Sequence, residues 1–189
     1  MTAPTSPLLR PPRVLVLGVG NAWRGDDAVG LVVAQRLQED PLDGVTVTLT
    51  AGEGTALLAL WQDTDAVVLV DAVCAGVCAG ARPGTLHRFA VGTEPLPALF
   101  SGISTHAFGV AEAIELARAL RQLPPVLVVY GVEGETFETG AGLSAAVAAV
   151  VPQVVAQVRQ EVLALTARST LHDLPQAGQA TSARCVCCA

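Results

Sequence analysis

Two carboxylates and one imidazole occupy positions in the chain from which they could share a metal ion. Asp27 follows the first apolar stretch, Asp71 ends the third predicted strand, and His106 opens the helix expected after the fourth strand. Because the carboxyl ends of parallel strands and the helices that follow them meet at one edge of a sheet, we expect these residues to lie together. Such a set can hold a transition metal and leave positions open for water or substrate.

Each of these side chains also has a simpler explanation. Asp26 and Asp27 would complement the dipole of a helix in its first turn, and Asp71 could cap a turn by accepting backbone N–H groups. His106 at a helix start could be incidental, although the positive end of the dipole would keep its ring neutral, as a metal ligand must be. The long separations form no compact ligand motif, so the residues alone leave both interpretations open.

The segment that would position the first carboxylates runs from a strand through a turn into a helix. Residues 14–17 are apolar without alternation, which is typical of a strand covered on both faces. Gly18 and Gly20 allow the backbone to turn where a side chain would clash. Asp26 and Asp27 then fall in the first turn of a helix expected over residues 26–39.

The rest of the chain alternates between predicted strands and helices. Further strands are expected at 45–49, 66–70, 85–89 and 126–129, and further helices at 55–61, at 106–121 and from 143 to 165. Pro152 should kink the last helix or split it in two, and residues 131–142 should form a loop. The pattern predicts an α/β fold, a three-layer helix–sheet–helix sandwich of about five strands. The sheet should be mainly parallel, with the short strand at 85–89 antiparallel.

Composition narrows the class of protein. The net charge is −6 and every basic residue is Arg, which argues against nucleic acid and anionic membrane as partners. No apolar run approaches the roughly 20 residues of a membrane helix, and no signal peptide precedes residue 13. We therefore expect a soluble, cytoplasmic protein. One domain should cover residues 13–165, between a flexible lead-in at 1–12 and a disordered tail at 166–189.

A phosphate-binding loop is a weaker alternative for the opening turn. Gly18 and Gly20 begin a dinucleotide fingerprint, but Trp23 occupies the position of its third glycine. Thr50 follows the second strand, where such folds carry an acidic residue. The sequence also contains no Gly-x-Ser-x-Gly motif for a serine nucleophile.

The remaining cysteines and histidines carry little signal. An odd count of five unevenly spaced cysteines makes a poor disulfide framework. His87 alternates along its predicted strand and is most simply a surface residue. The residues interpreted as loop filling or as incidental parts of the tail are Cys74, Cys78, His172, Cys185, Cys187 and Cys188.

Four blocks of sequence occur in the order found in one enzyme family. They are Gly18-Val-Gly20-Asn21 with Asp26-Asp27 and Gly30; Val70-Asp71-Ala72 with Pro83-Gly84; Thr105-His106 with Gly109-Val110; and Gly131-Val132-Glu133 with Gly140, Leu143-Ser144 and Val147. Through these blocks, from about residue 13 to residue 165, the chain resembles the maturation endopeptidases of nickel–iron hydrogenases.

The resemblance implies a specific activity and partner. Enzymes of this family remove the C-terminal extension of the hydrogenase large-subunit precursor after nickel has been inserted. The family's three metal-binding residues correspond to Asp27, Asp71 and His106. The metal is expected to be nickel supplied by the substrate, with no organic cofactor and no catalytic residue separate from these ligands. Asn21 and Asp26 would orient the ligands or their loop.

One departure and one alternative remain. Relatives usually carry an Asp-Gly-Gly-Thr-like stretch after the second strand, where this chain has Thr50-Ala-Gly-Glu53, so a substrate contact by that loop is in doubt. The alternative function is a non-catalytic, nickel-sensing chaperone of hydrogenase assembly. In either case the expected partner is the large-subunit precursor, and the protein is expected to be a monomer.

Overall fold

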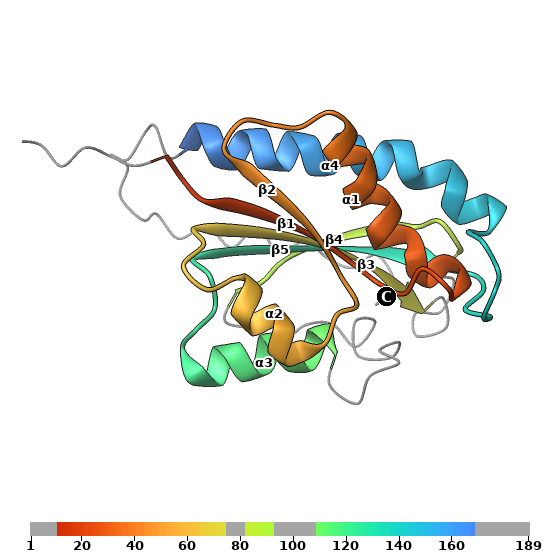
Figure 1. The fold of residues 1–189 in the computed structure, drawn as a ribbon, viewed down its shortest axis with the longest axis horizontal. Coiled ribbons are helices and arrows are strands. Elements are labelled where there is room, and N and C mark those ends of the chain that lie inside the picture. Colours follow the sequence, from red (N-terminus) through yellow and green to blue (C-terminus); the bar gives the residue numbers. More distant parts are fainter. Residues whose placement is uncertain (1–10, 75–81, 93–108, 169–189) are drawn as a thin grey trace, which may run out of the picture.

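A five-stranded sheet forms the centre of the molecule, with helices on both faces (Figure 1). The computed structural model describes residues 11–74, 82–92 and 109–168. The strand order is β2-β1-β3-β5-β4, and only β4 runs antiparallel to its neighbour. This confirms the predicted fold class. The strands are β1 (Val14–Val19), β2 (Val45–Thr50), β3 (Ala66–Cys74), β4 (Leu86–Ala90) and β5 (Val126–Gly134).

The helices divide between the two faces of the sheet. Helices α1 and α4 cover one face, and α2 and α3 cover the other (Figure 1). Their bounds are α1 (Val29–Glu39), α2 (Gly54–Leu60), α3 (Val110–Leu120) and α4 (Ala145–Arg168), with a short 3-10 helix, η1 (Gly25–Ala28), directly before α1. No helix in the described ranges is long and apolar enough to cross a membrane.

Alternate residues of the central strands enter two separate cores, because successive side chains of a strand point to opposite faces. Val68 of β3 and Val128 of β5 belong to the core under α1 and α4. Leu69 and Val129 belong to the core under α2 and α3. This alternation fixes which face each polar residue further along β3 and β5 occupies.

Two strands are longer than the apolar runs that predict them. β3 and β5 remain paired as far as the register Cys74↔Gly134. Asp71 therefore lies inside β3 rather than at its end, and residues 131–134 belong to β5 rather than to a loop. Hydropathy marked only the amino-terminal part of each strand, because backbone pairing continues into residues with polar or small side chains.

Two helices also differ from expectation. Of the two effects expected of Pro152, the split does not occur, since α4 is one helix through the proline, with Val151 and Val154 buried on either side of it. The helix ends at Arg168, inside the stretch expected to be disordered. α3 begins at Val110, later than the predicted start at His106, and the N–H of Gly109 donates to the Glu112 carboxylate at 3.1 Å.

Candidate functional site at the carboxyl edge of the sheet

The turn after β1 brings the Asp26-Asp27 pair back against the end of that strand. Gly20 has φ +146°, and a Cβ placed there would lie 1.8 Å from the carbonyl oxygen of Asp27. Only glycine fits this approach. Gly30 is packed as closely, since its Cβ would lie 2.2 Å from the carbonyl oxygen of Val19 and 2.3 Å from that of Val70. The two glycines therefore hold η1 and α1 tightly against β1 and β3.

Asp26 is the anchor of this turn. Its side chain is fully buried and accepts three backbone N–H groups, from Glu135 at 2.8 Å, Thr136 at 3.1 Å and Ser144 at 2.6 Å. Burial alone would raise the pKa of this carboxyl, but these hydrogen bonds lower it below its ordinary value. Asp26 thus ties the loop after β1 to the loop between β5 and α4 through hydrogen bonds that all lie within the protein.

Asp27 and Asp71 form the electrostatically strained part of the site. Asp27 is 7% exposed in η1, and Asp71 is partly buried in β3, where its Oδ1 accepts the N–H of Ala72 at 2.9 Å. Burial, and then the negative charge of Asp27, raise the pKa of Asp71 to about 7. Two nearby carboxylates that resist ionising together are what a bound cation would stabilise.

The third predicted ligand, His106, lies outside the described residues, as do Cys78, His172, Cys185, Cys187 and Cys188. Within 11–74, 82–92 and 109–168, no three His, Cys, Asp or Glu side chains are grouped so that they could hold a metal ion. The described structure therefore brings together Asp27 and Asp71, two of the three predicted ligands.

The residues around the first turn shape the loop. Asn21 Oδ1 accepts the N–H of Trp23 at 2.9 Å, a local turn that leaves the Trp23 side chain 75% exposed. Thr50 ends β2, and its carbonyl oxygen accepts the N–H of Gly20 at 3.1 Å. Thr50 Oγ1 accepts the N–H of Gly52 at 3.3 Å. The Thr50 hydroxyl therefore organises its own loop.

A second polar pair, Glu133 and His87, lies on the same sheet. The sequence did not indicate this pair as a candidate site. Glu133 of β5 is fully buried, and its Oε1 lies 2.9 Å from Nε2 of His87 on β4. His87 is 25% exposed through its side chain, so its interpretation as a simple surface residue is wrong. The available signal was the acidic residue in Gly131-Val132-Glu133, which was assigned to a loop.

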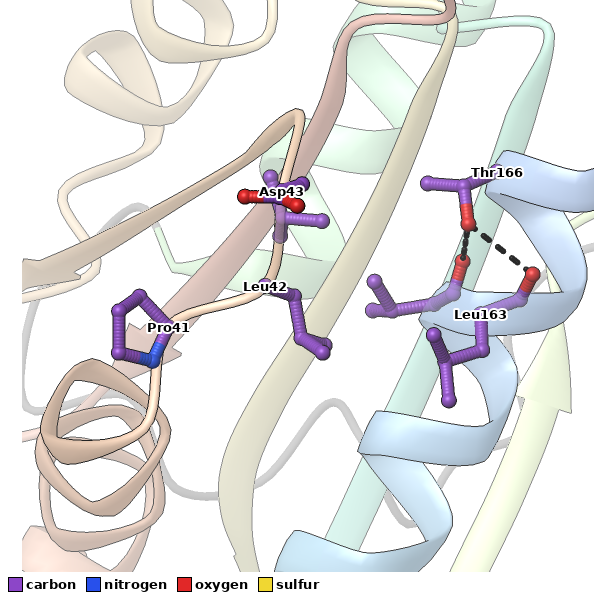
Figure 2. A pocket seen from close by; sticks show the side chains of 7 residues that line it. Pro41, Leu42, Asp43, Leu163 and Thr166 are labelled. Carbon is purple, nitrogen blue, oxygen red and sulfur yellow. Dashed lines mark hydrogen bonds between the residues drawn. The ribbon is translucent and has the colours of Figure 1, made fainter.

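The pocket in Figure 2 lies away from these groups. It has a volume of about 370 Å³ and is bordered by Leu42, Val45 and Leu163, between the turn that precedes β2 and the end of α4. That turn is at the amino edge of the parallel strands. Ligand sites in open α/β sheets lie at the opposite, carboxyl edge, where Asp27 and Asp71 are found.

Known proteins share this fold and much of this sequence. The family model for hydrogenase maturation protease matches residues 32–161. The hydrogenase 2 maturation protease of Escherichia coli strain K12 is 31% identical over 168 residues, which cover 85% of this chain and 99% of the relative. The HupD hydrogenase expression/formation protein of Rhodobacter capsulatus is 29% identical over 84% of this chain and 75% of its own.

A solved structure agrees with these relatives. The hydrogenase-maturating endopeptidase HybD from E. coli superimposes with a TM-score of 0.64 at 32% identity, covering 77% of this chain and 89% of that one. The chain therefore belongs to the hydrogenase maturation protease family.

Proposed function

We propose that this enzyme removes the C-terminal extension of a nickel–iron hydrogenase large-subunit precursor after nickel has been inserted. Asp27, Asp71 and His106 would hold the nickel carried by the substrate. The observation that carries this proposal is the coupling of two carboxylates at the carboxyl edge of the sheet, where the charge of Asp27 and burial raise the pKa of Asp71 to about 7.

A bound cation would relieve the repulsion between the two carboxylates. The site would therefore recognise a substrate that carries the cation. Carboxylates and imidazole suit first-row transition metals, and three protein ligands leave positions for groups of the substrate. Bound nickel would polarise the scissile carbonyl or activate a water. Asp26 and Asn21 would keep the loop that carries Asp27 in position, through the hydrogen bonds that they make to backbone groups.

The test is cleavage of purified precursor in two forms, nickel-loaded and nickel-free, followed by mass spectrometry. We expect the loaded precursor to lose its C-terminal extension and the nickel-free precursor to stay intact. Equal cleavage of both forms would rule out recognition of nickel. An unchanged precursor mass in both, despite binding, would instead favour the nickel-sensing chaperone.

The role of His106 is tested with a variant in the same assay. His106→Ala should abolish cleavage while the circular dichroism spectrum and the unfolding midpoint remain those of the wild type. Arg88→Ala, which removes an exposed ion pair to Glu161 on the other face of the sheet, is the matched control and should cleave normally. Retained cleavage by His106→Ala would remove that residue from the site.

A further inference from the structure

Burial of the Glu133 carboxylate in β5 costs free energy. Its side chain has no solvent exposure, and only one of its oxygens is used, by His87 at 2.9 Å. Within the part of the chain that the structure describes, Oε2 has no hydrogen-bond partner. Burying a carboxylate with an unsatisfied oxygen costs free energy that an apolar side chain at this position would not cost. Such a group, beside a titratable partner, points to a role in function rather than in stability.

The pair occupies the same face of the sheet as Asp71. Asp71 is paired with Gly131 of β5, and Gly131 is paired with His87 of β4. Odd-numbered residues of β3 and β5 face α2 and α3, as Leu69 and Val129 do. By the same alternation Asp71, Glu133 and His87 share that face, while Arg88 reaches α4 on the other.

The register also gives the separation of the two groups. Asp71 and His87 are two strands apart, so their Cα atoms are about 10 Å apart. The residue between them is Gly131, which adds no side chain to the face. A peptide group held at Asp71 would therefore lie on the same face of the sheet as His87, with only Gly131 between them in the register. Glu133 lies one step nearer the carboxyl edge, at the register of Val73.

The pair does not extend the metal site. Among the described residues no three potential ligands are close enough to share a metal ion, so Glu133 and His87 do not join Asp71 as a ligand group. The arrangement is instead that of a base oriented by an acid. A carboxylate that accepts from one ring nitrogen fixes the tautomer and leaves the other nitrogen, Nδ1, to exchange a proton.

We propose that His87, oriented by Glu133, is the proton carrier of peptide cleavage in this enzyme. The proposal rests on the endopeptidase function proposed above. Nδ1 takes a proton from the water whose oxygen forms a bond to the scissile carbonyl carbon. The imidazolium then gives that proton to the amide nitrogen as the carbon–nitrogen bond breaks. The products are a carboxylate and an ammonium group, which together account for the atoms of the water. Glu133 is a positioning residue, which holds the ring through its hydrogen bond to Nε2.

The test uses single-turnover cleavage of the nickel-loaded precursor by the full-length enzyme. His87→Gln is the decisive variant, because its amide N–H can still donate to Glu133 Oε1 but cannot carry a proton. We expect the rate constant at saturating enzyme to fall about 100-fold or more, with unchanged affinity for the precursor. Arg88→Ala, on the same strand but facing away, should leave both values unchanged.

Glu133 is tested through the ring that it orients. Glu133→Gln should lower the same rate constant about 10-fold in wild type, and should have no further effect in the His87→Gln background, because it acts through His87. Added imidazole should restore part of the rate to His87→Ala. A purely structural pair would predict none of these results.

The outcomes separate this inference from the function on which it rests. If wild type cuts the precursor and His87→Gln cuts it at the same rate, the pair is structural and the inference is wrong. If His87→Gln weakens affinity but leaves the saturated rate unchanged, His87 binds substrate and carries no proton, which also overturns it. If wild type does not cut at all, the proposed function itself fails.

Discussion

Asp26 and Asp27 are adjacent in the chain and both are removed from solvent, yet they belong to different kinds of structure. Asp26 accepts three backbone N–H groups, and the pKa of its carboxyl is lowered. Asp27 lies beside Asp71, and its charge helps to raise the pKa of Asp71 to about 7. The Asp26 carboxylate accepts hydrogen bonds from the protein around it, whereas the negative charges of Asp27 and Asp71 repel each other. From this difference we expect Asp26 to contribute to stability and the pair of Asp27 and Asp71 to contribute to function.

The strongest test of this difference between Asp26 and Asp27 is to remove the charge of Asp27 alone. Asp27→Asn keeps the shape of the side chain, so we expect the fold to be retained and cleavage of nickel-loaded precursor to fall about 1,000-fold, since metal polarisation contributes several kcal/mol to catalysis. The rate is followed by mass spectrometry, with the unfolding midpoint as a control for folding. Cleavage close to the wild-type rate would place Asp27 outside the site.

Asp26→Asn should have the converse effect, on stability. The amide offers one acceptor oxygen where the carboxylate offers two, so an N–H group from Glu135, Thr136 or Ser144 loses its charged partner. We expect the free energy of unfolding to fall by about 3 kcal/mol at pH 7. Chemical denaturation measures it. A loss below 0.5 kcal/mol would mean that Asp26 is not the anchor of the two loops.

The pH dependence of that loss follows from the lowered pKa. Asp26 stabilises the folded state while it is ionised, so its contribution is present above its ordinary pKa and disappears as the pH falls through the lower folded value. The gap between wild type and Asp26→Asn should therefore narrow in acid. The gap is read from denaturation curves taken from pH 7 downward.

Asp71→Asn should stabilise the metal-free enzyme. The pKa of Asp71 is raised from 3.8 to about 7 in the folded protein, so the unfolded chain releases its proton first. Wild type then loses stability as the pH rises from about 4 to about 7. Asparagine does not ionise, and we expect a gain of about 2 kcal/mol at pH 8, a value reduced because Asp71 is partly exposed.

The control for this substitution is the same measurement at about pH 2.5, well below the ordinary pKa of 3.8, where the gain should vanish because the carboxyl is protonated in both states. The same variant should no longer cleave the precursor, so that stability and activity change in opposite directions. A loss of stability at pH 8 would show that Asp71 is held by favourable interactions, as Asp26 is.

The sequence predicted where the carboxylates lie but not the contacts that distinguish them. The mainly parallel sheet, the antiparallel β4 and the position of Asp27 and Asp71 at one edge followed from apolar runs and the rules of parallel sheets. The anchoring role of Asp26 did not, because its partners are backbone groups more than 100 residues away, which no local pattern encodes.

The position of Glu133 within a strand could not be predicted from the sequence for a related reason. Its neighbours are glycines and polar residues, which suggested a loop, whereas pairing with β3 continues the strand as far as Gly134. Tertiary pairing decides the strand end where local propensity is weak. The contact with His87 then follows from the register of β4 on β5, which could be set only once both strands were in place.

The smallest effect is expected for a substitution of Ser144. It distinguishes the role of the Ser144 backbone N–H, which donates to Asp26, from the role of the Ser144 side chain. The N–H of Ser144 donates to Asp26, while its Oγ accepts the N–H of Val147 in the first turn of α4 at 3.3 Å. Ser144→Ala removes the hydroxyl and keeps the N–H, so we expect a loss of about 1 kcal/mol, the usual cost of a helix cap. Denaturation measures this loss beside that of Asp26→Asn. If the two losses were equal, the side chain of Ser144, rather than the backbone N–H groups that donate to Asp26, would hold the two loops together. Asp26 would then serve only to cap the start of α4 and would not anchor the loops.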